Sequence, residues 1–206
     1  MPVERKALAW FLNQVKLFSM KQEPNTDQGL SWLGKFRRTA TNLRRTVMNV
    51  FVLDDNIELS ASYLCDKHIV KMTLETAQLL CTNYYGSPYK PTHSNHPWSR
   101  WLRFSSYNWF WLMSYFDAVL NEYSYRYNRV HKCKEVYNWL NSDLKFRDSF
   151  VNNDFSKITD MPQCMPPQYY DEDVVKSYRK YYLGEKTRFA KWNYRAEPHW
   201  WTSKTP

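Results

Sequence analysis

The chain has 206 residues, is 43% apolar and 18% aromatic, and carries a formal net charge of +9. This length and apolar content predict a folded protein with a sizeable core and exclude a chain disordered throughout, and no apolar run is long enough to span a membrane. The four glycines, Gly29, Gly34, Gly86 and Gly184, stand apart, which excludes the Gly-rich phosphate loops of P-loop enzymes and dinucleotide-binding dehydrogenases.

Residues 1–47 are the most basic part of the chain, with nine Lys and Arg against three Asp and Glu. Their pattern predicts short amphipathic helices over about 4–20 and 31–46, separated by a turn-rich stretch. This segment fits a DNA-gripping arm, an accessory lid or a translated upstream extension, because Met48 opens the next segment like a second start. We therefore divide the chain into a basic helical N-terminal extension, 1–47, and a helical catalytic and nucleic-acid-binding domain, 48–206.

The first half of the second domain contains the best strand candidate. Residues 48–54 form a short apolar run typical of a strand, and 57–84 lack Pro and Gly and repeat apolar residues at helical spacing. Residues 86–97 then hold three prolines, which predict a loop. We expect at most a minimal β element here, followed by one long helix and then a loop rich in polar side chains.

The second half is predicted to be helical. Residues 98–129 fit two helices or one bent helix, and 131–143 fit another. A helix over 172–183 begins with acidic residues and has Gly184 as its stop. The predicted fold is therefore mainly α: a compact helical domain with at most a minimal β element near 49–54.

A polar stripe on the helix predicted over 57–84 is the first candidate for chemistry. At 100° per residue its members fall within an arc of about 100°; they are Lys67, His68, Lys71, Glu75 and Gln78. Such a stripe can bind a phosphate and move a proton, and crowding of its amines favours a free amine as nucleophile. The alternative is a solvated face in which Lys71 and Glu75 form an ordinary i,i+4 ion pair.

The proline-bounded loop is the second candidate. His93, Asn95 and His96 lie on it, and Trp98 and Arg100 follow directly. Placed over the stripe, this loop supplies an acid, a phosphate clamp and a stacking ring. The alternative is a rigid loop whose histidines cap neighbouring backbone.

A zinc site is the competing interpretation of these histidines. Cys65 and His68, like His93 and His96, have a spacing that zinc uses, but the other cysteines complete no ligand set. The four cysteines instead fit the free thiols of a cytoplasmic protein. We therefore predict no metal and no cofactor.

Two further groups of side chains are candidate substrate contacts. Asn108 precedes Glu122 and Arg126, which sit one turn apart and fit a buried ion pair that orients a site or is purely structural. Trp192 and Arg195 belong to a basic, aromatic tail that fits either stacking on unpaired bases or a plug that closes the core. Basic charge together with abundant aromatic rings favours a nucleic-acid partner, DNA in particular, unless the rings merely fill the core.

Five of these runs together resemble a tailed-phage family of small proteins sometimes labelled pyrimidine-dimer DNA glycosylase-like. The resemblance covers about 48–201 and is carried by residues 49–54, 65–78, 89–97, 122–127 and 192–201. It implies a helical enzyme of the host-cell cytoplasm that flips a damaged base, attacks the sugar with an amine and cleaves the strand by β-elimination. The endonuclease V type uses the α-amine of an N-terminal Thr. Here Pro2 follows Met1, and a freed Pro amine is one alternative nucleophile, but it lies outside the resembling region; without it, Lys67 or Lys71 is the amine.

The combined interpretation is a DNA glycosylase with possible AP-lyase activity. Lys67 or Lys71 is the amine and Glu75 the general acid and base, while His68, His93, His96 and Arg100 contact phosphates and the transition state. Gln78, Asn95, Trp98, Asn108, Arg126, Trp192 and Arg195 complete the predicted substrate contacts. The alternatives are a non-catalytic nucleic-acid- or protein-binding accessory module and another nucleotide- or base-modifying enzyme.

Overall fold

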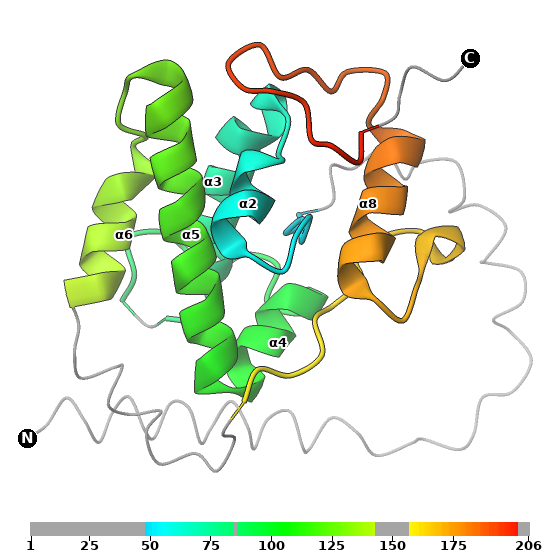
Figure 1. The fold of residues 1–206 in the computed structure, drawn as a ribbon. Helices are drawn as coiled ribbons and strands as arrows, with labels where there is room; N and C mark the ends of the chain where they lie inside the picture. The colour runs from blue at the N-terminus through cyan, green and yellow to red at the C-terminus, as the bar shows by residue number, and fades with distance from the viewer. Residues whose placement is uncertain (1–47, 85, 143–156, 202–206) are drawn as a thin grey trace, which may run out of the picture. The chain divides into compact units, whose positions relative to one another are not determined.

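The computed structural model describes residues 48–84, 86–142 and 157–201 (Figure 1). The described helices are α2 (Ile57–Ser62), α3 (Asp66–Thr82), α4 (Pro97–Phe104), α5 (Ser106–Tyr127), α6 (Cys133–Ser142), η2 (Pro167–Tyr169) and α8 (Val174–Glu185). These ranges contain no strand, so the prediction of a mainly α domain is confirmed. The predicted helices over 4–20 and 31–46 lie outside the described residues.

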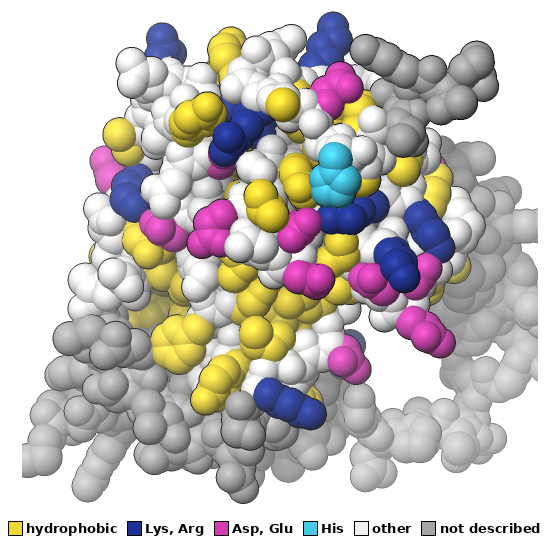
Figure 2. Space-filling view, viewed as in Figure 1, with side chains coloured by type: hydrophobic (Ala, Val, Ile, Leu, Met, Phe, Trp, Pro, Cys, Tyr) yellow, Lys and Arg dark blue, Asp and Glu magenta, His cyan; other side chains and the backbone are white. Residues whose placement is uncertain are grey.

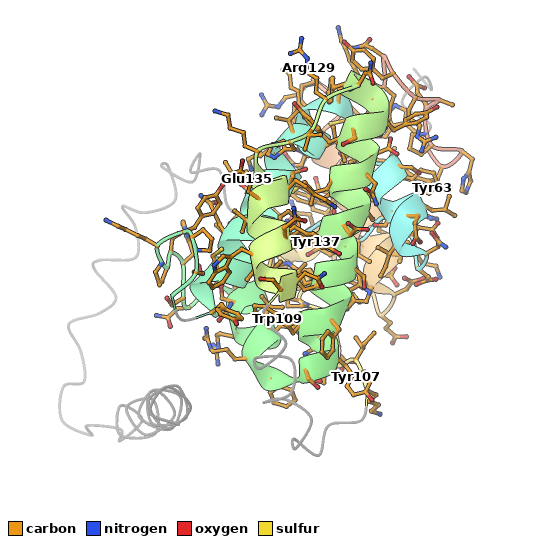
Figure 3. All side chains as sticks on the ribbon, turned by 90° about the vertical axis from the view of Figure 1, so that its left-hand side faces the viewer. Tyr63, Tyr107, Trp109, Arg129, Glu135 and Tyr137 are labelled. Atoms are coloured by element: carbon orange, nitrogen blue, oxygen red, sulfur yellow. The ribbon has the colours of Figure 1, made fainter. Side chains whose placement is uncertain are left out.

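Helix α5 organises the packing because it contacts α2, α3, α4 and α6. Its buried side includes Trp111, Leu112, Tyr115 and Phe116. In Figure 3, Tyr137 points from α6 toward α5, where its ring meets that of Phe116 edge-on at 5.6 Å. Many of the aromatic residues therefore fill the core, as one interpretation of the composition expected.

The apolar run at 48–54 is buried but is not a strand, which corrects the sequence-based expectation. Its backbone is hydrogen-bonded by side chains instead of a neighbouring strand. Leu53 N–H donates to Ser60 Oγ (2.9 Å), and Leu53 C=O accepts from Arg179 Nε (2.8 Å). Phe51 C=O accepts from the hydroxyl of Tyr115 (3.2 Å). These bonds satisfy buried backbone groups that a sheet would otherwise have to pair.

The long helix predicted over 57–84 is divided into α2 and α3, so that prediction was wrong at residues 63–65. Arg126 of α5 donates to the carbonyl oxygens of Ser62 and Leu64, each at 2.8 Å, and Tyr182 of α8 accepts from Cys65 N–H at 3.0 Å. These partners come from elements far along the chain. Nothing local in the sequence signals the break because its residues are compatible with a helix.

The C-terminal half follows the prediction more closely. Residues 98–129 form α4 and α5, which are separated at Ser105, whose Oγ accepts from Tyr107 N–H. Asp173 caps α8 by accepting from the N–H groups of Val175 and Lys176, in line with the predicted acidic start of this helix. Gly184, predicted as the stop, lies within α8 instead. Its lack of a side chain makes room for Tyr169, whose hydroxyl would be 2.5 Å from an added Cβ.

Candidate active site

Helix α3 carries all five residues of the predicted stripe, but the structure divides them by burial. His68 and Glu75 are buried, Lys71 and Gln78 are half-buried, and Lys67 is exposed. This gradient follows from packing, because other faces of α3 contact α4, α5 and α6. The stripe therefore joins a buried carboxylate to amines that reach the surface.

Glu75 and Lys71 form the closest contact in the stripe. Lys71 Nζ lies 2.7 Å from Glu75 Oε1, and the side chains are 38% and 10% exposed. The second carboxylate oxygen accepts a hydrogen bond from the backbone N–H of Asn49 at 3.1 Å. A buried carboxylate is thus held in contact with a primary amine that solvent can reach.

Asn49 connects Glu75 to the region after the proline-bounded loop. Its side-chain oxygen accepts from Trp98 Nε1 (3.3 Å) and from the Tyr178 hydroxyl (3.1 Å). His96, which caps α4 by accepting from Trp98 N–H, also interacts with the Met48 backbone. The stripe and the His96 end of the loop therefore meet at Met48 and Asn49.

The rest of the loop is anchored at its base and exposed at its tip. Thr82 of α3 exchanges hydrogen bonds with the backbone of Thr92, and Arg103 of α4 donates to Ser94 C=O. His93 is exposed, has a positive φ of 54°, and bonds to its neighbour Thr92. Asn95 and Arg100 are also exposed.

His68 is an uncharged hydrogen-bonding group in this structure. The Tyr182 hydroxyl, which accepts from Cys65 N–H, lies 2.7 Å from His68 Nδ1, and the imidazole stacks on Phe51 with centroids 4.7 Å apart. Burial, together with the charges of Lys186 and Lys71, lowers the pKa of His68 to about 3. A neutral imidazole at physiological pH positions Tyr182 and Phe51 rather than binding a phosphate as a cation.

The C-terminal end of α8 adds two cations that the candidate list from the sequence missed. Lys186 Nζ donates to the Tyr181 hydroxyl at 3.1 Å, and burial lowers its pKa, as do Lys71 and Arg188. Lys67 Nζ and Arg188 Cζ lie 5.6 and 5.4 Å from the centre of the Phe189 ring. We call Lys67, Lys71, Lys186 and Arg188 the basic edge. The basic tail was visible in the sequence, but its approach to α3 depends on contacts between distant segments.

Other predicted contacts are engaged inside the protein. Trp98 and Asn108 are fully buried, and Asn108 Nδ2 donates to Trp101 C=O. Trp192 is buried and donates to Tyr63 C=O. Trp98 and Trp192 therefore present no exposed face on which a base could stack in this structure.

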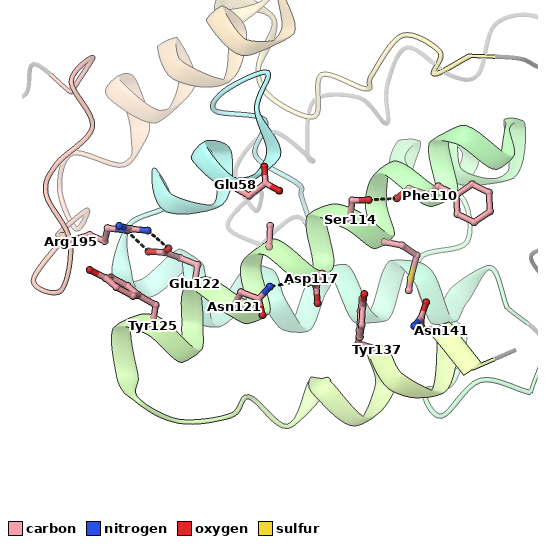
Figure 4. Close-up of a pocket in the computed structure, with 12 residues that line it drawn as sticks. Glu58, Phe110, Ser114, Asp117, Asn121, Glu122, Tyr125, Tyr137, Asn141 and Arg195 are labelled. Atoms are coloured by element: carbon pink, nitrogen blue, oxygen red, sulfur yellow. Dashed lines mark hydrogen bonds and ion pairs between the residues drawn. The ribbon is translucent and has the colours of Figure 1, made fainter. Parts of the chain in front are cut away.

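A shallow groove lies between α5, α6 and the C-terminal segment (Figure 4). It has a volume of 560 Å³, and its lining includes Glu58, Asp117, Glu122, Tyr125 and Arg195. We call it the acidic groove. None of the residues that line it belongs to α3, so it is separate from the Lys71–Glu75 pair.

Within 48–84, 86–142 and 157–201, no cluster of three or more His, Cys, Asp or Glu could hold a metal ion. None of the helices in these same ranges is long and apolar enough to cross a membrane.

Residues 48–135 match the family model described as pyrimidine dimer DNA glycosylase. Over these residues the match confirms the resemblance to pyrimidine-dimer DNA glycosylases, and it includes Asn49, Lys71 and Glu75. No curated protein and no solved structure matches the chain. The match supports a DNA glycosylase-like activity with DNA as the substrate.

Proposed function

We propose that the chain is a DNA glycosylase that acts on pyrimidine dimers and cleaves the resulting abasic strand, with Lys71 as the attacking amine and Glu75 as the acid and base. One observation carries this proposal: Lys71 Nζ lies 2.7 Å from the buried Glu75 carboxylate, and the Lys71 side chain is 38% exposed. We also propose that it works in the cytoplasm, that of an infected host cell if the chain is encoded by a phage.

The pair can perform the reaction without a cofactor. Glu75 accepts a proton from the Lys71 ammonium, and the neutral amine attacks C1′ of the deoxyribose. The bond from C1′ to the nitrogen of one pyrimidine breaks, and that base takes the bonding electrons and a proton while it stays joined to its dimer partner. The attached amine then loses a proton, the C1′–O4′ bond breaks, O4′ gains a proton, and a protonated imine joins Lys71 to the opened sugar. Removal of a C2′ proton then expels the 3′ phosphate, which cleaves the strand.

The surroundings of Glu75 favour Lys71 over Lys67. Lys67 Nζ lies above the Phe189 ring, whereas Lys71 Nζ touches the carboxylate. The backbone nitrogen of Asn49 also contacts the Glu75 carboxylate, but in the full chain it is an unreactive amide. In a chain that began at Asn49, the same nitrogen would be an α-amine, the type of nucleophile that the endonuclease V resemblance implies.

The basic edge supports DNA as the substrate. Its four cations lie on or beside α3, where they can bind phosphates on both sides of an extruded nucleotide. The aromatic rings of Tyr181 and Phe189 lie among these cations. Phosphate binding at this edge would place the sugar near the Lys71 amine.

Borohydride trapping tests the proposal. Full-length protein is incubated with a duplex that contains one pyrimidine dimer, with and without borohydride. Base release, meaning cleavage of the bond from C1′ to the base and read after photoreversal of the dimer, is measured together with strand cleavage and the covalent complex. Reduction of the imine should trap the wild-type chain and the control Lys67→Ala, but Lys71→Ala should lose the complex. Mass spectrometry of the trapped peptide should locate the adduct on Lys71.

Each other result has a definite meaning. An adduct on a peptide that begins at Asn49 would assign the nucleophile to a freed α-amine. Base release without an adduct would mean that the nucleophile is a water molecule activated by Glu75 and not the Lys71 amine. Tight DNA binding with no base release would make the protein a non-catalytic binding module and overturn the proposal.

A further inference from the structure

Two apolar side chains stand out on the surface of α3. Val70 is 43% exposed and Leu74 is 41% exposed, and they lie one helical turn apart. The remaining apolar residues of α3, Ile69, Met72, Ala77, Leu79, Leu80 and Cys81, are all fully buried. The core therefore does not account for the presence of Val70 and Leu74.

These two residues border the proposed active site. At 100° per residue, Val70, Leu74, Gln78, Lys71 and Glu75 follow one another around the helix over an arc of about 140°. Burial follows the same order, from the exposed Val70 and Leu74, through the half-buried Gln78 and Lys71, to the buried Glu75. The exposed apolar pair and the reactive pair thus occupy adjoining sides of one surface.

The charges around the apolar pair favour a polyanion as its partner. Both acidic residues of α3, Asp66 and Glu75, are buried, so the exposed part of the helix carries Lys67 and Lys71 and no carboxylate. The other cations of the basic edge are close by, because Lys71 and Arg188, after burial, lower the pKa of Lys186. A partner that combines phosphates with apolar flat surfaces, which is the chemistry of DNA opened at a base step, satisfies both features.

From this arrangement we infer that Val70 and Leu74 form an apolar wedge that enters duplex DNA and occupies the space left by an extruded nucleotide. The inference rests on the proposed function and adds that the substrate is double-stranded. Enzymes that act on a base must take it out of the stack, and inserted apolar side chains compensate for the lost stacking. In single-stranded DNA there is no stack to open, so the wedge has little to contribute.

Fluorescence of 2-aminopurine measures this opening directly. The probe is placed opposite a pyrimidine dimer in a duplex, and full-length wild type is compared with Val70→Ala/Leu74→Ala. Alanine keeps the helix because it is the strongest helix former. Leu59→Ala is the matched control, because Leu59 is 45% exposed and lies on α2. We expect the fluorescence rise on binding to fall about tenfold in the double variant only, while its activity on a single-stranded dimer stays within about twofold of wild type.

The readouts separate the wedge from the proposed chemistry. A fluorescence rise that depends on Val70 and Leu74, in a protein that releases no base, would support the wedge and overturn the glycosylase. If the double variant releases the base from duplex DNA as well as wild type does, the wedge is overturned and the proposed chemistry is not. Light scattering tests protein association. If the wild-type protein is a homodimer and the double variant is a monomer, this surface mediates protein association, and the wedge is also overturned.

Discussion

Two buried carboxylates on neighbouring helices, Glu75 of α3 and Glu122 of α5, have the same local design and different chemistry. Each pairs with a cation one helical turn away: Lys71 Nζ is 2.7 Å from Glu75, and Arg126 Nε is 2.6 Å from Glu122. The difference lies in what else contacts each carboxylate and in which cation is present.

Glu122 is saturated by guanidinium groups. Arg195 donates to both of its oxygens, at 2.9 and 2.7 Å, in addition to Arg126 (Figure 4). Arg126 also donates to Asp66 and to two backbone carbonyls, which fixes the break between α2 and α3. A guanidinium does not lose its proton in a protein, so this network can hold structure but cannot transfer a proton.

The pair at Glu75 is open by comparison. Its cation is a primary amine, which can lose a proton, and the Lys71 side chain is 38% exposed. The surfaces beside the two pairs differ as well: the basic edge adjoins Glu75, whereas carboxylates gather on the face with the acidic groove (Figure 2). The identity of the cation and the exposure of the pair thus distinguish the site that we propose as reactive from the structural pair at Glu122.

The largest expected effect comes from Glu75→Gln. It removes the proton acceptor but keeps the shape of the side chain, so we expect base release to fall about a thousandfold. The midpoint of thermal unfolding should stay close to that of wild type. Single-turnover kinetics on the dimer duplex, together with a thermal melt, measure both quantities.

Glu122→Gln is the matched control and should have the opposite profile. It leaves the buried Arg126 with a weaker partner, so we expect the free energy of unfolding to fall by about 3 kcal/mol. Turnover per folded molecule should change little. Equal loss of turnover in the two variants, with both folded, would remove the distinction between the two carboxylates.

A smaller effect is expected on the pH dependence of the free energy of unfolding, because the imidazole of His68, on the same helix as Glu75, is buried. The folded-state pKa of His68 is about 3, against an ordinary value of 6.5, so between these values the folded state binds fewer protons than the unfolded state. The stabilisation from neutral His68 is therefore complete above pH 6.5 and decreases as the pH falls toward 3.

Between pH 7 and pH 5, His68 should lower the free energy of unfolding by about 2 kcal/mol. Chemical denaturation of wild type and His68→Gln at both pH values measures its share, because other histidines titrate in both proteins. Identical pH dependence in the two proteins would show that His68 is not held neutral by folding.

The smallest expected effect concerns the salt dependence of DNA binding. Lys67 is an exposed member of the basic edge, so Lys67→Ala should reduce the slope of log K against log salt by about one. Lys134, whose Nζ is 3.2 Å from Asp117 beside the acidic groove, is the control, and Lys134→Ala should leave the slope unchanged. A slope that responds to Lys134 and not to Lys67 would move the DNA-binding surface to the other face.

Local patterns account for what could be predicted. The helical class, the two-helix alternative for 98–129 and the acidic start of α8 follow from Pro and Gly placement, apolar periodicity and the helix dipole, which act within a few positions. The Lys71–Glu75 and Glu122–Arg126 contacts follow from i,i+4 spacing, because a helix brings such residues together wherever it lies.

Other features depended on residues far apart in the chain. The run at 48–54 has the composition of a strand, but side chains of Ser60, Tyr115 and Arg179 pair its backbone. The position of Lys186 beside α3 likewise has no signal in the spacing of residues.

By itself, the sequence determined that this protein is helical and basic and that it carries amine–carboxylate and guanidinium–carboxylate pairs on its helices. Only the tertiary structure decided which pair is saturated and which is open, because burial and long-range hydrogen bonds arise when distant segments pack. Arg195 closes the pair at Glu122 from 73 residues away, while packing buries Glu75 and leaves the Lys71 amine at the surface.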